Sequence, residues 1–160
     1  LFFFPGYLML VIAIAYLAIK KGFSKKLLMI SSLLVMIIAL ATYQDMHLPT
    51  TNIFFTLITA SYSVLVSILA LSAIWLISAF KQKKIPTRLW WVAVGLVLAM
   101  IADALIGKFW IFGANGQGYF PLISHLNWII YFGSQALIQQ LPIALLQIKA
   151  ELNPEPMTSN

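Results

Sequence analysis

Five long runs of apolar residues follow one another along the chain, and short polar segments separate them. The runs do not alternate between apolar and polar positions, and each is too long for a β-strand. A helix of about 20 residues, with a range of roughly 17–25, crosses the hydrocarbon core of a bilayer. We therefore predict an all-α fold, a polytopic transmembrane helical bundle, with spans at about Phe2–Lys20, Lys26–Tyr43, Asn52–Phe80, Leu89–Phe109 and Pro121–Ile148.

Composition supports a membrane protein, because 62% of the residues are hydrophobic and only 9% are charged. Soluble domains carry about 25% charged residues. The absence of cysteine excludes disulfides, thiolate nucleophiles and cysteine-ligated metals. We expect residues 1–150 to form a single transmembrane helical domain and the polar residues 151–160 to form a disordered tail.

The distribution of Lys and Arg predicts the orientation of the spans. Nine of the 10 lie in the first or third loop or after the last span, and Lys108 alone lies on the opposite side. Cytoplasmic loops of membrane proteins are enriched in Lys and Arg. We therefore expect a multi-pass integral membrane protein whose N-terminal end in this chain lies outside and whose C-terminal tail is cytoplasmic. The net charge of +6 is explained by topology and does not indicate nucleic-acid binding.

Asp103 is the only carboxylate inside any of the apolar runs. A charged group at membrane depth costs at least about 2.5–3.5 kcal/mol, so such residues usually face a bundle interior and mark chemistry or transport. Gly95 and Ala99 precede Asp103 at helical spacing and share its face. Small residues allow membrane helices to approach closely. The sequence therefore predicts that Asp103 lies on a packed side of its helix.

Polar residues of the last span are expected at the depth of Asp103. Counted from the same membrane surface, Asp103 lies about 10 Å deep, Asn127 about 9 Å and Tyr131 about 15 Å. Asn127, Tyr131 and Gln135 are spaced i, i+4, i+8 and line one face. We predict a polar pocket that opens to the outer half of the membrane, with Tyr62 and His125 at its edge.

These residues also have structural explanations. Asp103 can be a packing acid that is hydrogen-bonded to Tyr131, and the tyrosine and glutamine side chains can link helices at about 0.6–2 kcal/mol per bond. His125 can be an interfacial residue. The two histidines have no metal-binding spacing, and the sequence contains no serine-hydrolase elbow, P-loop or dinucleotide motif. We therefore predict no metal and no cofactor.

Three segments of the chain resemble the C-terminal half of the YhhN-like family, which comprises integral membrane lysoplasmalogenases. The segments are Ser61–Trp75, Val94–Trp110 and Asn127–Ile138. In this resemblance Asp103 matches the acid of a Ser-Asp pair, and Phe109 matches the Phe that follows it. Tyr131 and Gln135 match a Tyr-x-x-x-Gln motif.

The first span, Phe2–Tyr16, is similar to a middle helix of the family, with Gly6 and Tyr16 in place. Members of the family have about eight spans, so the resemblance implies that this chain begins at the fourth. An acidic Gly-Asp helix would then precede Leu1. The chain has Ala102 where the family has Ser, and Ala13 where it has His.

The resemblance implies an enzyme of ether lipid metabolism. It would hydrolyse the vinyl ether bond of lysoplasmalogens to a fatty aldehyde and a glycerophospho-headgroup. Carboxyl groups in apolar surroundings can keep their proton near neutrality and act as general acids. Asp103 would be the acid or would stabilise the oxocarbenium ion, while Tyr131 and Gln135 would orient the acid or a water molecule.

The same resemblance implies the partners of the chain, namely a lysophospholipid substrate and membrane lipid. Tyr16, Tyr62, His125 and Asn127 would bind the substrate. The alternative is a non-catalytic polytopic membrane protein, which is a lipid-binding, transport or scaffold subunit. In that case Asp103 is structural or relays protons.

The Lys and Arg count gives a direct test of orientation. In intact cells, a single cysteine introduced at Gln117 is expected to react with a membrane-impermeant maleimide, whereas one at Lys83 is expected to stay unlabelled until the cells are lysed. The positive-inside distribution places these loops on opposite sides. The reverse labelling pattern would contradict the predicted orientation.

Overall fold

The computed structural model describes residues 3–44, 52–80, 85–111 and 121–152. Apart from short turns, these residues are helical and include no strand, which confirms the prediction of an all-α protein. The helices in chain order are α1 (Phe4–Lys20), α2 (Lys25–Gln44), α3 (Ile53–Phe80), α4 (Thr87–Leu105), the π-helix η1 (Ile106–Ile111), α5 (Pro121–Ile138) and α6 (Leu141–Leu152).

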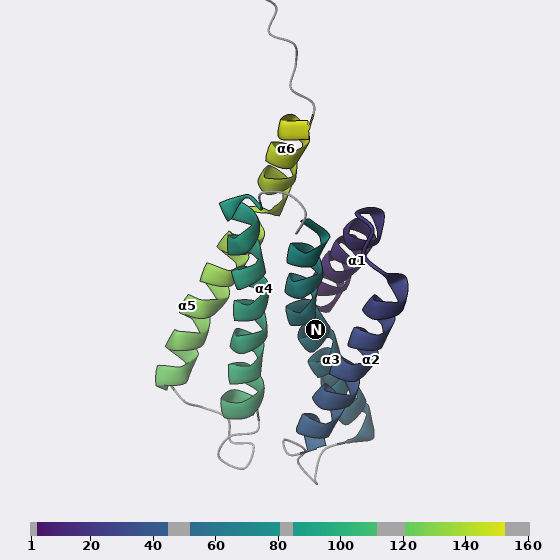
Figure 1. Ribbon diagram of the computed structural model, residues 1–160. Coiled ribbons are helices and arrows are strands. Elements are labelled where there is room, and N and C mark those ends of the chain that lie inside the picture. The colour runs from purple at the N-terminus through teal and green to yellow at the C-terminus, as the bar shows by residue number, and fades with distance from the viewer. Residues whose placement is uncertain (1–2, 45–51, 81–84, 112–120, 153–160) are drawn as a thin grey trace, which may run out of the picture.

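Helix α3 lies at the centre of the bundle and contacts α1, α2 and α4, while α5 packs on the other side of α4 (Figure 1). Helices α1 to α5 run up and down, so that neighbours in the chain are antiparallel. Helix α6 projects from the end of the bundle that also holds the connection between α1 and α2 (Figure 1). The arrangement places the middle of α4 between α3 and α5.

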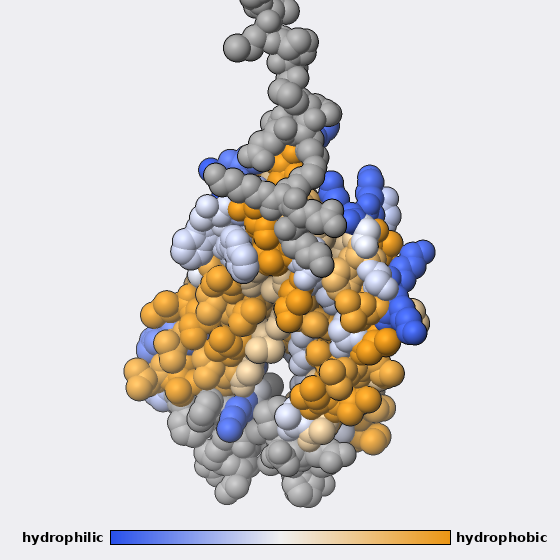
Figure 2. Space-filling view, viewed as in Figure 1, coloured by the Kyte–Doolittle hydropathy of each residue, from blue (hydrophilic) through white to orange (hydrophobic). Residues whose placement is uncertain are grey.

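Four helical segments are long and apolar enough to cross a membrane: Lys25–Tyr43, Ile53–Phe80, Thr87–Lys108 and Pro121–Lys149. Helix α1, with 17 residues, is a shorter apolar helix. The surface over the middle of the bundle is apolar, and hydrophilic residues gather near the connection between α1 and α2 (Figure 2). A soluble monomer does not expose such a continuous apolar surface. These features indicate a multi-pass membrane protein.

One of the predicted helices is interrupted. The segment Pro121–Ile148 is not one helix, because α5 ends at Ile138 and α6 begins at Leu141. Pro142 explains the break, since proline lacks an N–H and its ring clashes with the carbonyl group four residues earlier in a continuous helix. The span predicted at Leu89–Phe109 agrees with the apolar segment Thr87–Lys108, although its α-helical part ends at Leu105 and η1 follows.

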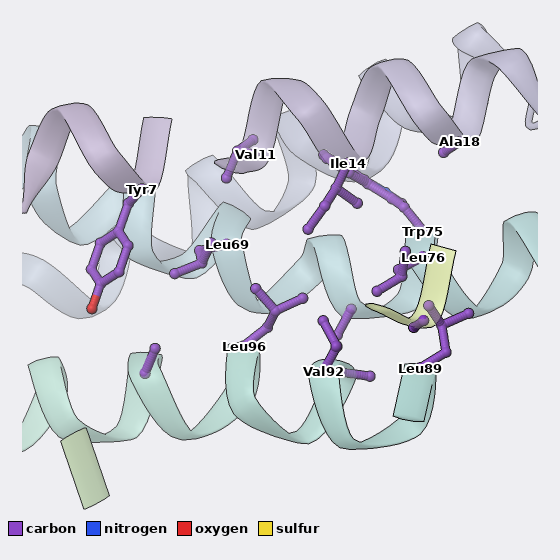
Figure 3. Close-up of a cluster of buried hydrophobic side chains, with 14 of the residues drawn as sticks. Tyr7, Val11, Ile14, Ala18, Leu69, Trp75, Leu76, Leu89, Val92 and Leu96 are labelled. Atoms are coloured by element: carbon purple, nitrogen blue, oxygen red, sulfur yellow. The ribbon is translucent and has the colours of Figure 1, made fainter. Parts of the chain in front are cut away.

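Buried aliphatic side chains from α1, α3 and α4 form the core of the bundle. Figure 3 shows Val11 and Ile14 of α1 pointing toward Leu69 of α3 and Leu96 of α4. Because lipid tails are as apolar as these side chains, close packing and hydrogen bonds hold membrane helices together. One such bond joins α3 to α2, where the indole Nε1–H of Trp75 donates to Ser31 Oγ at 3.2 Å.

Helices α4 and α5 approach most closely at Gly95. A Cβ atom on this glycine would lie 2.8 Å from the Cβ of Leu137 and 2.9 Å from the carbonyl oxygen of Ser134. Gly95 and Ala99 are both buried. The small side chains before Asp103 therefore line the packed side of α4, as the sequence predicts.

Replacing Gly95 with alanine is expected to lower stability by about 1–3 kcal/mol, because the added methyl group forces the two helices apart. Gly133→Ala is the matched control, since a Cβ atom there meets nothing within 4 Å. Thermal unfolding in detergent, followed by tryptophan fluorescence, measures both variants. Equal melting temperatures for the two variants would contradict the close contact.

Candidate functional site

Asp103 lies in the last turn of α4, with its half-buried carboxyl group directed into the bundle. The hydroxyl group of Tyr62, from α3, donates a hydrogen bond to Asp103 Oδ1 at 3.0 Å. The other carboxyl oxygen, Oδ2, is buried and has no hydrogen-bond partner among the described residues. The acid is therefore held on one oxygen and unpaired on the other.

Tyr7 brings α1 into the same site. Its side chain is only 4% exposed. Its hydroxyl oxygen accepts a hydrogen bond of 3.5 Å from Gln135 Nε2, on α5, and interacts electrostatically with the carboxyl group of Asp103. Four helices thus meet at one polar centre. We call Tyr7, Tyr62, Asp103, Tyr131 and Gln135 the tyrosine–aspartate cluster.

Aromatic rings surround this cluster. The ring centroids of Tyr7 and Tyr62 lie 6.5 Å apart, and those of Phe4 and Tyr62 lie 6.4 Å apart. Phe3 lies near aromatic rings of both α1 and α5, with its ring centroid 6.4 Å from that of Tyr7 and 5.2 Å from that of Tyr131. The polar groups are thus set in an aromatic environment, whose ring faces can stabilise a positive charge.

The structure does not contain the predicted hydrogen bond between Asp103 and Tyr131 among its described residues. Tyr131 is half-buried and interacts electrostatically with Asp103, but no hydrogen bond joins the two among the described residues. Its ring packs against Phe3 and, edge-on at 6.0 Å, against Trp128. Tyr62 occupies the place that the sequence argument gave to Tyr131.

Of the other predicted site residues, Asn127 faces the bundle, whereas His125 and Tyr16 do not. Asn127 is only 3% exposed, and its Oδ1 has no hydrogen-bond partner within the described parts of the chain. His125 is exposed. Tyr16 is 65% exposed and lies nine residues beyond Tyr7, or about 14 Å along α1. The structure therefore does not bring Tyr16 or His125 into the cluster.

The sequence argument missed Tyr7, although the chain carries a signal for it. Tyr7, Val11, Ile14 and Ala18 are the buried residues of α1, and their spacing follows one helical face. The only hydroxyl group on that face belongs to Tyr7. A search for polar residues on the packed face of the first span would have found it.

The π-helix η1 begins three residues after Asp103. At the junction the N–H of Ile106 donates to the carbonyl oxygens of both Ala102 and Asp103. Short π-helical segments within helices occur frequently at functional sites. The change from α-helix to π-helix therefore occurs close to Asp103.

A groove of about 400 Å³ runs between α3 and α4, lined chiefly by Ala73, Ile74, Ile77, Trp90, Val94 and Val97. With about 3.6 residues per turn, its α4 residues lie on the opposite side of that helix from Asp103. The groove is therefore separate from the cluster. No group of three or more possible metal ligands occurs within the described ranges.

No family model matches this chain, and neither a curated protein nor a solved structure matches it. The comparisons therefore do not support the resemblance to the YhhN-like family, which stays a prediction from the sequence. What is established is a helical protein with four long apolar helices.

Removing the hydroxyl group of Tyr62 tests the central contact. Tyr62→Phe is expected to lower stability by about 0.6–2 kcal/mol, the range found for hydrogen bonds between membrane helices. Tyr16→Phe is the control, because Tyr16 is exposed and outside the cluster. Thermal unfolding in detergent compares the two variants. If both unfold at the wild-type temperature, the bond between Tyr62 and Asp103 does not contribute to stability.

Proposed function

We propose that this chain is a membrane-embedded hydrolase that cleaves the vinyl ether bond of lysoplasmalogens. The proposal takes its substrate class from the sequence resemblance to YhhN-like lysoplasmalogenases. The observation that supports it best is the carboxyl group of Asp103, which Tyr62 holds on one oxygen while Oδ2 is unpaired within the described residues. A carboxyl group oriented in this way suits proton transfer to a substrate.

Vinyl ether hydrolysis needs an acid and a water molecule, but no nucleophilic side chain. Protonated Asp103 gives its proton to the vinyl carbon distant from the ether oxygen. The π electrons form the new C–H bond, and the ether oxygen stabilises the resulting cation as an oxocarbenium ion. Water adds to that ion and returns one proton to the Asp103 carboxylate. The hemiacetal then collapses to a fatty aldehyde and a free hydroxyl group on the glycerophospho-headgroup.

The cluster gives each participant a role in this reaction. Tyr62 fixes the orientation of the acid, and Gln135 links α5 to Tyr7 on α1. The carboxylate formed after proton transfer, together with the surrounding ring faces, stabilises the oxocarbenium ion. Tyr131 and Asn127 line the same side of α5, where they contact substrate or water. Tyr16 and His125 are the other expected substrate-binding residues. They would contact only those parts of the substrate that extend beyond the cluster.

Orientation belongs to the same proposal. With the N-terminal end of the chain outside and the tail cytoplasmic, Asp103 lies in the outer half of the membrane. A lysophospholipid in that half would place its headgroup at the surface and its vinyl ether, next to the glycerol, just below it. The proposed partners are therefore the lysophospholipid substrate and membrane lipid.

The second candidate is a non-catalytic membrane protein, a lipid-binding, transport or scaffold subunit in which Asp103 is structural or relays protons. Two observations favour it. The hydrogen bond from Tyr62 to Asp103 links α3 to α4, and this structural role is enough to explain the acid without any catalysis. Ala13 and Ala102 also stand where the family has His and Ser.

Replacing the acid separates the two functions. Asp103→Asn is expected to lower hydrolysis about 10²–10⁴-fold, because asparagine has the same shape but cannot deliver a proton. The bond from Tyr62 survives, since the side-chain carbonyl oxygen of asparagine also accepts, so the variant stays folded. Aldehyde release from lysoplasmalogen in detergent gives the rate, and thermal unfolding of the same sample gives the stability.

The control variant is Ser72→Ala, since Ser72 is buried in α3 and its hydroxyl group donates to the carbonyl oxygen of Leu69 in the same helix. It should hydrolyse the lipid at the wild-type rate. Wild-type activity in Asp103→Asn would exclude Asp103 as the acid. Inactive wild-type protein would favour the non-catalytic candidate.

A further inference from the structure

Two buried oxygen atoms close to the proposed reaction lack a hydrogen-bond donor among the described residues: Asp103 Oδ2 and Asn127 Oδ1. When Asp103 is ionised, its carboxylate oxygen and the amide oxygen of Asn127 are both acceptors, so they cannot satisfy each other directly. Buried polar atoms in folded proteins are nearly always paired with protein or ordered water. Both atoms therefore call for a group that donates.

Asp103 and Asn127 lie at the same depth on neighbouring helices. The contact of Gly95 with Ser134 fixes the register of α4 against α5. From this contact Asp103 is eight residues, or about 12 Å, along α4, and Asn127 is seven residues, or about 10 Å, back along α5. Because the helices are antiparallel, these steps lead in the same direction and end at one level (Figure 1).

The side chain of Asn127 also lies on the face of α5 that meets the cluster. Asn127 and Ser134 are the two buried residues of α5, and they are two helical turns apart on one face. Tyr131, one turn from Asn127, interacts electrostatically with Asp103. Gln135, one turn further, donates to Tyr7. Asn127 is the remaining member of this stripe, at the level of the acid.

We infer that a single water molecule binds between Asp103 Oδ2 and Asn127 Oδ1, where it donates one O–H to Asn127 and, when Asp103 is ionised, the other to Asp103. Water supplies two donors and adds no charge, and buried waters typically make about three hydrogen bonds to such groups. The hydroxyl group of Tyr7, which accepts from Gln135 and interacts with the carboxyl group of Asp103, borders the same site.

The position gives this water a function, which rests on the proposed hydrolysis. Once Asp103 has protonated the vinyl carbon, its carboxylate is the base nearest to the water. The water oxygen forms a bond to the oxocarbenium carbon as one of its protons passes to Asp103 Oδ2. Asn127 Oδ1 holds the other proton and so fixes the direction of the oxygen lone pair. Asn127 is thus a positioning residue for the water step.

Isotope exchange in D₂O tests this role. Asn127→Leu is expected to lower kcat about 100-fold with an unchanged KM, since loss of alignment costs rates of this order. Protonation of the substrate still occurs, but the cation returns a hydron before water adds. Recovered lysoplasmalogen should therefore carry deuterium at its vinyl carbon, which mass spectrometry detects, whereas lipid recovered from wild type and from Ser72→Ala should not.

Asn127→Ala gives the same readout if the leucine variant does not fold. A wild-type kcat in a folded variant, or a rise in KM alone, would overturn the role of Asn127. So would a slow variant whose recovered lipid carries no deuterium.

A second measurement does not depend on activity. A structure of the protein in nanodiscs, at a resolution that shows ordered water, is expected to show one water within hydrogen-bonding distance of both oxygens, absent in Asn127→Leu. A direct protein partner for either oxygen would overturn the inference. If wild-type protein does not hydrolyse lysoplasmalogen, the proposed function fails, and this structure alone decides whether the water site exists.

Discussion

The hydrogen bond from Tyr62 to Asp103 is the contact on which the arrangement of the site depends. An acid on a membrane helix must be satisfied inside the bundle, because lipid offers it no donor. The bond requires a rotation of α4 about its axis that turns Asp103 toward α3. The side of α4 away from Asp103 lines the apolar groove together with residues of α3.

The rest of α4 agrees with this rotation. Its buried residues fall into an aliphatic row that meets α1 and α3, as Figure 3 shows for Leu89, Val92 and Leu96, and a small-residue row that meets α5. Bulky side chains fill the first interface, while Gly95 lets backbones meet at the second. Asp103 lies where the two rows end, so both neighbouring helices can reach its carboxyl group. One oxygen meets a donor from α3, and the carboxyl group also interacts with Tyr7 of α1 and Tyr131 of α5.

Hydropathy predicted most of the fold, because a membrane requires helices of a minimum length and four of the five predicted spans meet it, while α1 is shorter. The small residues before Asp103 also predicted which side of α4 would pack. The partner of the acid was harder to predict. Helical rise fixes the depth of a side chain, and both Tyr62 and Tyr131 are at a suitable depth, but the rotation of each helix decides between them. That rotation comes from packing across the whole interface.

Local chemistry accounts for the other differences. Pro142 lies within an apolar run, so the average hydropathy of that run does not predict a break. Its missing N–H nevertheless ends α5 at Ile138. Nothing in the run after Asp103 signals the π-helix, since apolar residues suit both kinds of helix. Tyr7 lies on the buried face of α1 with Val11, Ile14 and Ala18, and the apolar pattern of that span does not by itself mark Tyr7 as part of a site.

The close contact at Gly95 has a mechanical consequence for the pair α4 and α5. Where two backbones touch, the helices can neither slide along each other nor separate without losing that contact. The angle between the two helices can still change, with the contact at Gly95 as the fixed point. Asp103 and Asn127 lie about two turns from this point, where a small rotation produces a larger displacement. A change in the angle between α4 and α5 would therefore move Asp103 and Asn127 further than the residues beside Gly95.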